Sequence, residues 1–423
     1  MNLPALSWSY IRTKPLNTFL NILLLALGIA IITVLLLASK QIERSLTQNS
    51  RGIDLVVGAK GSPLQIILSS IFHMDYPTGN ISLADARQLS RNRLIQNTIP
   101  MALGDSYQGY RIVGTNHQYL TLYQAAVAEG KRWEQPLEVT VGATAAQQMG
   151  LSMGDIFTSS HGLVDDHINV HDEHHFQVTG ILAPTQTVVD NLILTAVESV
   201  WLVHDTHGAD STQVTDEHEH HEDEAHDHPH ETGIALEGLP EGDGEITSLL
   251  VKFRSPMAAV QLPRYINEQT NMQAASPPFE TARLFSLIGV GVDMLQGFAY
   301  VIVVIAALSI FIALYNSLKA RRYDLAVMRS LGASPGMLFT HVVLEGFIIT
   351  LVGCGVGLLM GHAVLYAATQ LYARPGQLGI SPLQFASEEL WILLVSLVIG
   401  LFASLIPAIN AYRTNISEVL AER

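Results

Sequence analysis

Four long apolar runs, separated by polar chain of very unequal length, dominate the hydrophobic pattern of this sequence. They lie near residues 16–38, 298–318, 337–367 and 390–409. Twenty-odd helical residues cover the roughly 30 Å hydrocarbon core of a bilayer, so each run predicts a transmembrane helix. One long, mostly polar stretch lies between the first and second runs, whereas the other gaps are short. The pattern therefore predicts an α-helical membrane protein with four transmembrane helices and a large α+β extracytoplasmic domain inserted between helices 1 and 2.

The first run could also be a cleavable signal peptide, because Arg12 and Lys14 precede it as a basic n-region would. It is longer than the roughly 7–15 apolar residues of a usual h-region, and no A-x-A cleavage site follows it. A retained helix is therefore the favoured interpretation.

Basic residues predict the orientation of the helices. They gather before the first run, between the second and third runs, and after the fourth, so four spans place all three groups on the cytoplasmic side. Lys40, Arg44 and Arg51 are exceptions, since they would lie outside. The predicted boundaries are a cytoplasmic N-terminus (1–15), transmembrane helix 1 (16–39), the extracytoplasmic domain (40–283), a stalk with transmembrane helix 2 (284–318), a short cytoplasmic helix (319–336), transmembrane helix 3 (337–367), an external loop (368–388), transmembrane helix 4 (389–410) and a cytoplasmic tail (411–423).

Within the inserted domain, β-branched runs alternate with helix-compatible segments. "LEVTVGATAAQQMGLSMGDIF" predicts a strand, a helix and a turn, and "ITSLLVKFRSPMAAVQLPRYINEQT" predicts a strand and then a helix. "HFQVTGILAPTQTVVDNLILTAVESVW" predicts a strand, a loop and a further strand or helix. This alternation favours small α/β subdomains over a single β-barrel.

Composition narrows the chemistry of the chain. No Lys or Arg occurs between Arg132 and Lys252, and the whole chain carries a net charge of −15, which disfavours nucleic acid or an anionic surface as a partner of that segment. The single cysteine, Cys354, excludes intramolecular disulfides and Cys-based metal sites. No P-loop motif occurs, so the sequence shows no ATP-binding loop of that kind. The segment "HDEHH" differs from the helical zinc-protease motif, because it has Asp172 in place of Glu and continues into a strand-like segment. We therefore predict no enzymatic activity and no catalytic residues in this chain.

Histidines form the one unusual cluster of candidate ligands. Thirteen of the 17 lie between His161 and His230, and the acidic, His-rich stretch at about 204–245 predicts a disordered loop. Imidazoles with carboxylates suit zinc or another divalent transition metal. The alternatives are a solvated loop that binds metal only as any His-rich tag does, and pH sensing by histidine. The predicted metal ligands are His218, His220, His221, His226, His228 and His230, with His171, His174 and His175 as a second group.

The last third of the sequence resembles the permease core of the MacB/FtsX-type ABC transporter permease family. The resemblance is carried by "KARRYDLAVMRSLGASPGMLFTHVVLEGFIITLVGCGVGLLMG" and by the ending "PAINAYRTNISEVLAER". "LSWSYIRTKPLNTFLNILLLALGIAII" is similar to the family's first helix, and "YRIVGTN", "EGKRWEQP", "VGATAAQQMGLSMGD" and "FQVTGILAPTQTVVDN" are similar to its external domain. The resemblance covers nearly the whole chain except the His-rich loop.

The short cytoplasmic helix is amphipathic by its own pattern, with Leu325, Met328 and Leu331 recurring at helical spacing. Gly332 can end it, and Ser334–Pro335 can begin the next helix. The segment could be a plain connector, whereas the resemblance implies a coupling helix that docks on an ATPase. The residues implied for that coupling are Arg321, Arg322, Asp324, Leu325, Met328, Arg329 and Gly332.

Gly353, Gly357 and Gly361 share one face of the third helix and predict close helix packing. That packing could lie within one chain or, as paired permeases of the family suggest, between two chains. Glu345 and His341 lie near the cytosolic end of the same helix, where a carboxylate is a functional candidate.

The resemblance implies a permease subunit in the bacterial inner membrane, multi-pass, with its large domain facing the periplasm. It would transmit the motion of a separate ABC-type ATPase to that domain and so move a substrate, and the histidines point to cargo related to zinc or a metallophore. Implied partners are the ATPase, a second copy or a homologous permease, membrane lipid, and a periplasmic adaptor or outer-membrane component. The alternative is an FtsX-like signalling module that activates an external partner such as a cell-wall hydrolase.

Overall fold

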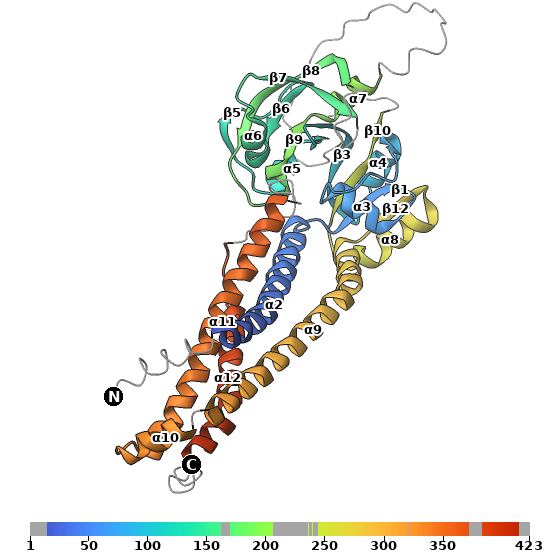
Figure 1. Cartoon of the computed structure of the whole chain (residues 1–423). Helices are drawn as coiled ribbons and strands as arrows, with labels where there is room; N and C mark the ends of the chain where they lie inside the picture. The colour runs from blue at the N-terminus through green and yellow to red at the C-terminus, as the bar shows by residue number, and fades with distance from the viewer. Residues whose placement is uncertain are drawn as a thin grey trace, which may run out of the picture. The chain divides into compact units, whose positions relative to one another are not determined.

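The computed structural model describes residues 15–161, 170–205, 236, 239, 244–320, 322–371 and 383–413. The chain divides into two compact units (Figure 1). One contains residues 1–42, 287–373 and 380–423, and the other contains residues 43–286 and 374–379. Since α2 and α9 each contribute residues to both units, the division falls within these two helices.

Among the described residues, four helices are long and apolar enough to cross a membrane, and all or most of each lies in the first unit: α2 (Pro15–Asn49), α9 (Pro277–Ala320), α11 (Pro335–Leu371) and α12 (Glu388–Tyr412). Their shared core includes Leu25 and Ile29 of α2, Val303 and Ile310 of α9, and Ile349 of α11. A fifth helix, α10 (Arg322–Ser330), lies between α9 and α11 in the chain. The predicted four-helix membrane architecture is confirmed.

Two of these helices are longer than the apolar pattern predicts. Helix α2 continues through Asn49, ten residues past the predicted end at residue 39, and α9 begins at Pro277 and not at residue 284. Polar residues such as Lys40, Glu43 and Arg44 have adequate helix propensity, so the helix continues after the hydrophobic run stops. Forty-four helical residues correspond to roughly 66 Å, about twice the hydrocarbon thickness.

The second unit contains the α+β domain. Its strands are β1 (Leu55–Ala59), β2 (Ile81–Ser82), β3 (Ile95–Tyr107), β4 (Tyr110–Gly114), β5 (Val127–Gly130), β6 (Glu138–Val141), β7 (Ile156–His161), β8 (Val170–Leu182), β9 (Leu192–Thr195), β10 (Glu245–Ile246), β11 (Ser248–Phe253) and β12 (Met272–Ala275). Its helices are α3 (Pro63–Ser70), α4 (Leu83–Ser90), α5 (His117–Leu122), α6 (Ala143–Met149), η1 (Val188–Asn191), α7 (Val197–Asp205) and α8 (Ala258–Gln269).

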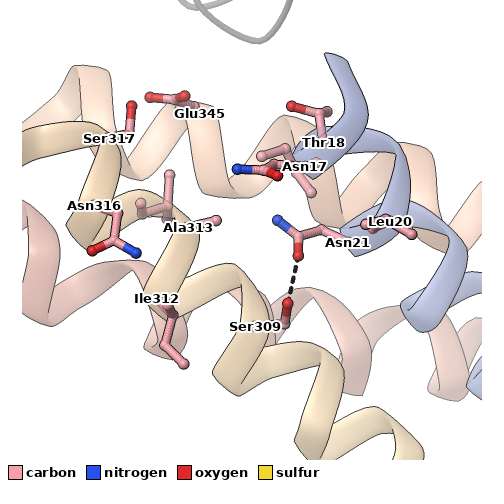
Figure 2. A pocket seen from close by; sticks show the side chains of 12 residues that line it. Asn17, Thr18, Leu20, Asn21, Ser309, Ile312, Ala313, Asn316, Ser317 and Glu345 are labelled. Atoms are coloured by element: carbon pink, nitrogen blue, oxygen red, sulfur yellow. Dashed lines mark hydrogen bonds between the residues drawn. The ribbon is translucent and has the colours of Figure 1, made fainter. Parts of the chain in front are cut away.

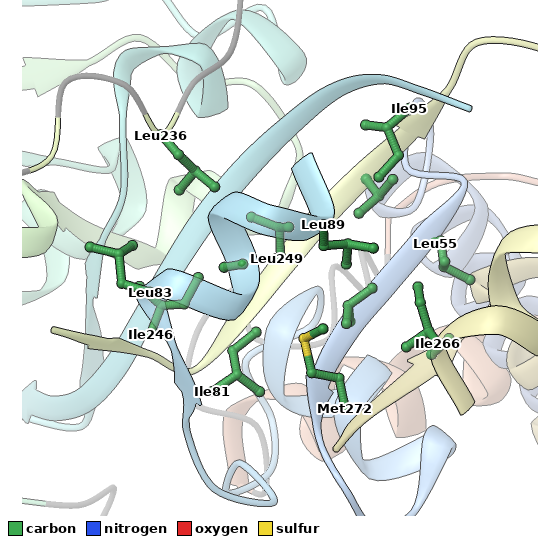
Figure 3. Packing of buried hydrophobic residues seen from close by; sticks show 14 of the residues in the cluster. Leu55, Ile81, Leu83, Leu89, Ile95, Leu236, Ile246, Leu249, Ile266 and Met272 are labelled. Atoms are coloured by element: carbon green, nitrogen blue, oxygen red, sulfur yellow. The ribbon is translucent and has the colours of Figure 1, made fainter. Parts of the chain in front are cut away.

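One half of this domain is a helix-covered sheet. Strands β12, β1, β11 and β3 are neighbours in that order, and every pairing among them is antiparallel. Figure 3 shows the core of this half, in which Leu83 and Leu89 of α4 and Ile266 of α8 pack against Leu55 and Leu249 of the sheet. All five side chains are at most 4% exposed, which is the burial expected of a well-packed core.

The other half is a closed barrel, because β7 pairs with both β3 and β8. The ring runs β3–β4–β9–β6–β8–β7 and returns to β3. Aromatic and β-branched side chains fill it, including Phe157, Phe176, Val139 and Ile193. The prediction of subdomains in place of a single β-barrel therefore holds for the domain as a whole, but the sequence did not indicate that one half closes into a barrel. Strands β3 and β7 lie about 50 residues apart in the chain, and their pairing leaves no local signal.

Candidate functional site

Helix α10 has both buried and exposed side chains among its described residues. Ala326 is fully buried, and Met328 packs against a cluster that includes Leu338 of α11 and Ala408 of α12. Tyr323 and Leu331 are 49% and 82% exposed. Met328 therefore fixes the helix to the membrane helices, while Tyr323 and, directly after the helix, Leu331 remain exposed.

The turn after α10 forms as its sequence predicts. Gly332 has a φ of 101°, a left-handed conformation that suits glycine, and the Ala333 N–H donates to the Met328 carbonyl. Ser334 then begins α11, since its Oγ accepts a hydrogen bond from the Met337 N–H. These contacts set the direction of α10 relative to α11.

The predicted coupling residues are described to different extents. Met328 and Arg329 are half-buried, and Gly332 ends the helix. Arg322, Asp324 and Leu325 lie in α10 by their backbone, and Arg321 lies outside the described residues. Their role in coupling stays a prediction.

The glycine face of α11 packs against α2 of the same chain. A Cβ atom on Gly353 would lie 2.8 Å from the Leu25 side chain, and one on Gly357 would lie 2.8 Å from the Ala26 carbonyl oxygen. At Gly361 it would lie 2.9 Å from Thr33 Cβ. The three glycines therefore allow two helices to approach closely, and α2 covers the face that a second chain would need.

A polar cavity of about 200 Å³ lies between α2, α9 and α11 (Figure 2). Glu345, from α11, lines it and is 8% exposed. Ser309 Oγ of α9 donates a 2.6 Å hydrogen bond to Asn21 Oδ1 of α2 across the cavity. The other polar lining residues are Asn17, Thr18, Asn316 and Ser317.

Sequence reasoning identified Glu345 but missed the polar residues of α2. Their signal was present in "LNTFLN", where Asn17 and Asn21 are four residues apart and so share one helix face. An amide side chain inside an apolar run is costly unless it finds a partner, which makes such a pair worth noting.

Charged residues also meet at the start of α12. Glu389, 3% exposed, accepts a 2.8 Å hydrogen bond from the Ala386 N–H, and its other oxygen lies 3.1 Å from His362 Nε2 of α11. Glu388 forms an ion pair with Lys40 of α2. Lys40, one of the three basic residues that fit the orientation rule poorly, thus has a carboxylate partner in the same unit.

The domain contains a buried polar chain that begins at the last residue of α2. Tyr123 donates a 2.7 Å hydrogen bond to the Asn49 carbonyl, and the Tyr119 ring meets the Tyr123 ring edge-on at 5.0 Å. A 3.2 Å hydrogen bond joins Tyr119 Oη to His73 Nε2. Burial, and then the neighbouring Arg111, lowers the pKa of His73 from 6.5 to about 3, so its imidazole is neutral at physiological pH.

The predicted metal ligands are only partly described. His218, His220, His221, His226, His228 and His230 lie outside the described residues. His171 lies in β8 by its backbone, His175 is exposed, and His174 Nε2 is buried without a hydrogen bond to another described residue. Within the part of the chain that the structure describes, no group of three His, Cys, Asp or Glu residues is arranged to hold a metal ion.

Two family models match the chain. The MacB-like periplasmic core domain matches residues 18–261, and the FtsX-like permease C-terminal domain matches residues 297–416. Among solved structures, the extracellular domain of the noncanonic ABC-type transporter YknZ from Gram-positive bacteria matches at 10% identity, over 53% of this chain and 99% of that one. The TM-score of that match is 0.28, too low to support an argument about the fold. No curated protein matches the chain.

Proposed function

This chain belongs to the MacB/FtsX-type family of ABC transporter permeases. From that premise, we propose that it couples a separate ABC-type ATPase to an external α+β domain. This coupling would move a substrate across or out of the bacterial inner membrane. The ATPase would dock on α10 at the cytosolic face. Its motion would pass along α2 and α9 to the domain on the periplasmic side. The permease would act as a pair, with itself or with a homologue.

The observation that carries the proposal is the exposed face of α10. Tyr323 is 49% exposed and Leu331, the residue after the helix, is 82% exposed, while Ala326 is buried and Met328 packs against residues of α11 and α12. A partner that covers Leu331 would push on a helix that is anchored to α11 and α12, so force on this face would reach the membrane helices.

The continuity of α2 and α9 supports transmission to the external domain. Both helices have residues in each unit, and the last residue of α2 is held by Tyr123 through its carbonyl and by the Val188 N–H through its side chain. A helix held at its end in this way can transmit a displacement along its axis without bending away from the domain.

The histidine content supports cargo related to zinc or a metallophore. The alternative function is FtsX-like signalling, in which the same motion activates an external partner such as a cell-wall hydrolase. The large two-part external domain favours transport, because the signalling branch of the family that this chain resembles typically carries a smaller one.

The test replaces Leu331 by Asp and measures ATP hydrolysis by the ATPase that co-purifies with the chain. Placing a charge in an apolar contact should weaken association about tenfold or more and lower turnover in parallel. Leu383→Asp is the matched control, because Leu383 is 81% exposed and lies in the segment just before α12, away from α10 in the chain. If both variants retain the parent's turnover, α10 is not the docking element.

A further inference from the structure

The closed barrel buries one carboxylate at the place where α7 contacts it. Asp105 lies on β3, at an irregularity in the register between Leu103 and Ser106, and is 4% exposed. Its Oδ2 atom accepts a 2.8 Å hydrogen bond from Ser159 Oγ on β7. That bond restrains the carboxylate and leaves Oδ1 directed elsewhere.

A histidine meets the other oxygen of this carboxylate. His204, in the last turn of α7, has Nε2 3.4 Å from Asp105 Oδ1, and its side chain is 34% exposed. Gly104 makes room for the imidazole, since a Cβ at that position would lie 3.0 Å from the same Nε2. The pair therefore joins a buried carboxylate to an imidazole that solvent can reach.

The 13 histidines between His161 and His230 form two groups in the sequence, one from His161 to His175 and one from His204 to His230, and the first residue of each group is a neighbour of Asp105. His161, the first histidine of one group, is the register partner of Asp105 in the β3–β7 pairing. His204, the first histidine of the other group, contacts Asp105 directly. These two positions are 43 residues apart in the chain, and the barrel brings them together.

The distance between His204 Nε2 and Asp105 Oδ1 suits two ligands of one metal ion better than it suits a strong hydrogen bond. Charge-assisted N–H···O bonds are usually about 2.7–2.9 Å long. Two atoms that each lie about 2.0–2.1 Å from a tetrahedral zinc ion are separated by roughly 3.3 Å, close to the 3.4 Å observed. The hydroxyl of Ser159 then plays the part of an outer partner that orients the carboxylate.

We propose that Asp105 Oδ1 and His204 Nε2 are two ligands of a zinc site on the folded external domain. A carboxylate with an imidazole selects zinc over calcium or magnesium, which prefer oxygen ligands alone. The site deepens the metal part of the proposed function by placing a ligand pair within the barrel. It needs no ATPase, so zinc binding stands or fails separately from transport.

A ligand replacement tests the site in the full-length chain purified in detergent. His204→Cys, loaded with one equivalent of Co²⁺, should show the intense near-ultraviolet band of a thiolate-to-cobalt charge transfer. Leu202→Cys is the matched control, because Leu202 is an exposed residue of the same helix α7 and should give no such band. Absence of the band from His204→Cys at full cobalt loading would overturn the proposal.

Zinc titration against a chelator gives an independent readout. His204→Gln and Asp105→Asn should each weaken the tightest zinc site at least tenfold, whereas Leu202→Gln, at an exposed position of α7, should not change it. Because Asp105 is buried and its replacement could disturb the barrel, His204→Gln decides the outcome. If His204→Gln binds zinc with the parent's stoichiometry and affinity, the two residues form only an ion pair and the proposal is wrong.

Discussion

Buried His73 predicts that the external domain loses stability in mild acid. The side chain is 5% exposed, hydrogen-bonded to Tyr119 and close to Arg111. Burial and, after it, the Arg111 charge lower its pKa from 6.5 to about 3. In the folded domain the imidazole therefore stays neutral at pH values where the unfolded chain is already protonated.

The sign and size of the effect follow from this difference. Because the folded-state pKa is lowered, the contribution of His73 is complete above the unfolded pKa of 6.5 and is lost as the pH falls toward 3. Each pKa unit corresponds to about 1.36 kcal/mol. The free energy of unfolding should therefore be about 1.4 kcal/mol lower at pH 5.5 than at neutral pH, and about 2.7 kcal/mol lower at pH 4.5.

Hydrogen exchange of the full-length chain in detergent measures this loss locally. Peptides that cover residues 66–76 and 117–125 report the opening free energy around His73, after correction for the intrinsic pH dependence of exchange. His73→Asn removes the titrating group and tolerates the left-handed backbone at this position, where φ is 54°. It should lower stability at neutral pH but give a flatter profile between pH 6.5 and 4.5.

The test depends on comparing the parent with its variants, because carboxylates also titrate in this pH range and would change the stability of all of them. His175→Asn, an exposed position, should keep the parent's profile. If the parent and His73→Asn lose opening free energy in parallel from pH 7.5 to 4.5, then His73 is not the group responsible and the reasoning from burial is refuted.

Two further predictions concern packing and hydrogen bonding. Gly357→Ala should destabilise the membrane helices by about 1–3 kcal/mol, because the added Cβ would lie 2.8 Å from the Ala26 carbonyl oxygen. Gly355→Ala is the control: a Cβ at that position would meet no atom within 4 Å, so the substitution should be neutral or stabilising. Thermal unfolding in detergent distinguishes them, and equal melting temperatures would contradict the packing of α11 on α2. Tyr123→Phe should lower the free energy of unfolding by about 1–3 kcal/mol, because the Asn49 carbonyl loses its hydrogen-bond donor. It should also speed amide hydrogen exchange at residues 43–49. Tyr265→Phe, at an exposed position on α8, is its control, and identical exchange in both variants would show that Tyr123 does not hold the end of α2.

Local properties of the sequence were enough to predict the membrane unit. A transmembrane helix depends on the length and apolarity of one continuous segment, so α2, α9, α11 and α12 were evident without any knowledge of their neighbours. The end of α10 was equally local, because Gly332 and Ser334 act on backbone groups within a few residues. The polar face formed by Asn17 and Asn21 was just as readable but was passed over inside an apolar run.

What lies opposite a given residue was decided only by the tertiary structure. The glycine spacing on α11 predicted a close approach, but only the fold identifies α2 of the same chain as the helix that approaches. Nothing near Asp105 in the sequence indicates His204, since the two meet only because β3 pairs with β4 and β7 and α7 packs on the resulting barrel. Helices and spans follow from hydrogen bonds and burial within one segment, whereas strand pairing joins distant segments through backbone groups that every residue carries, and so leaves little trace in residue identity.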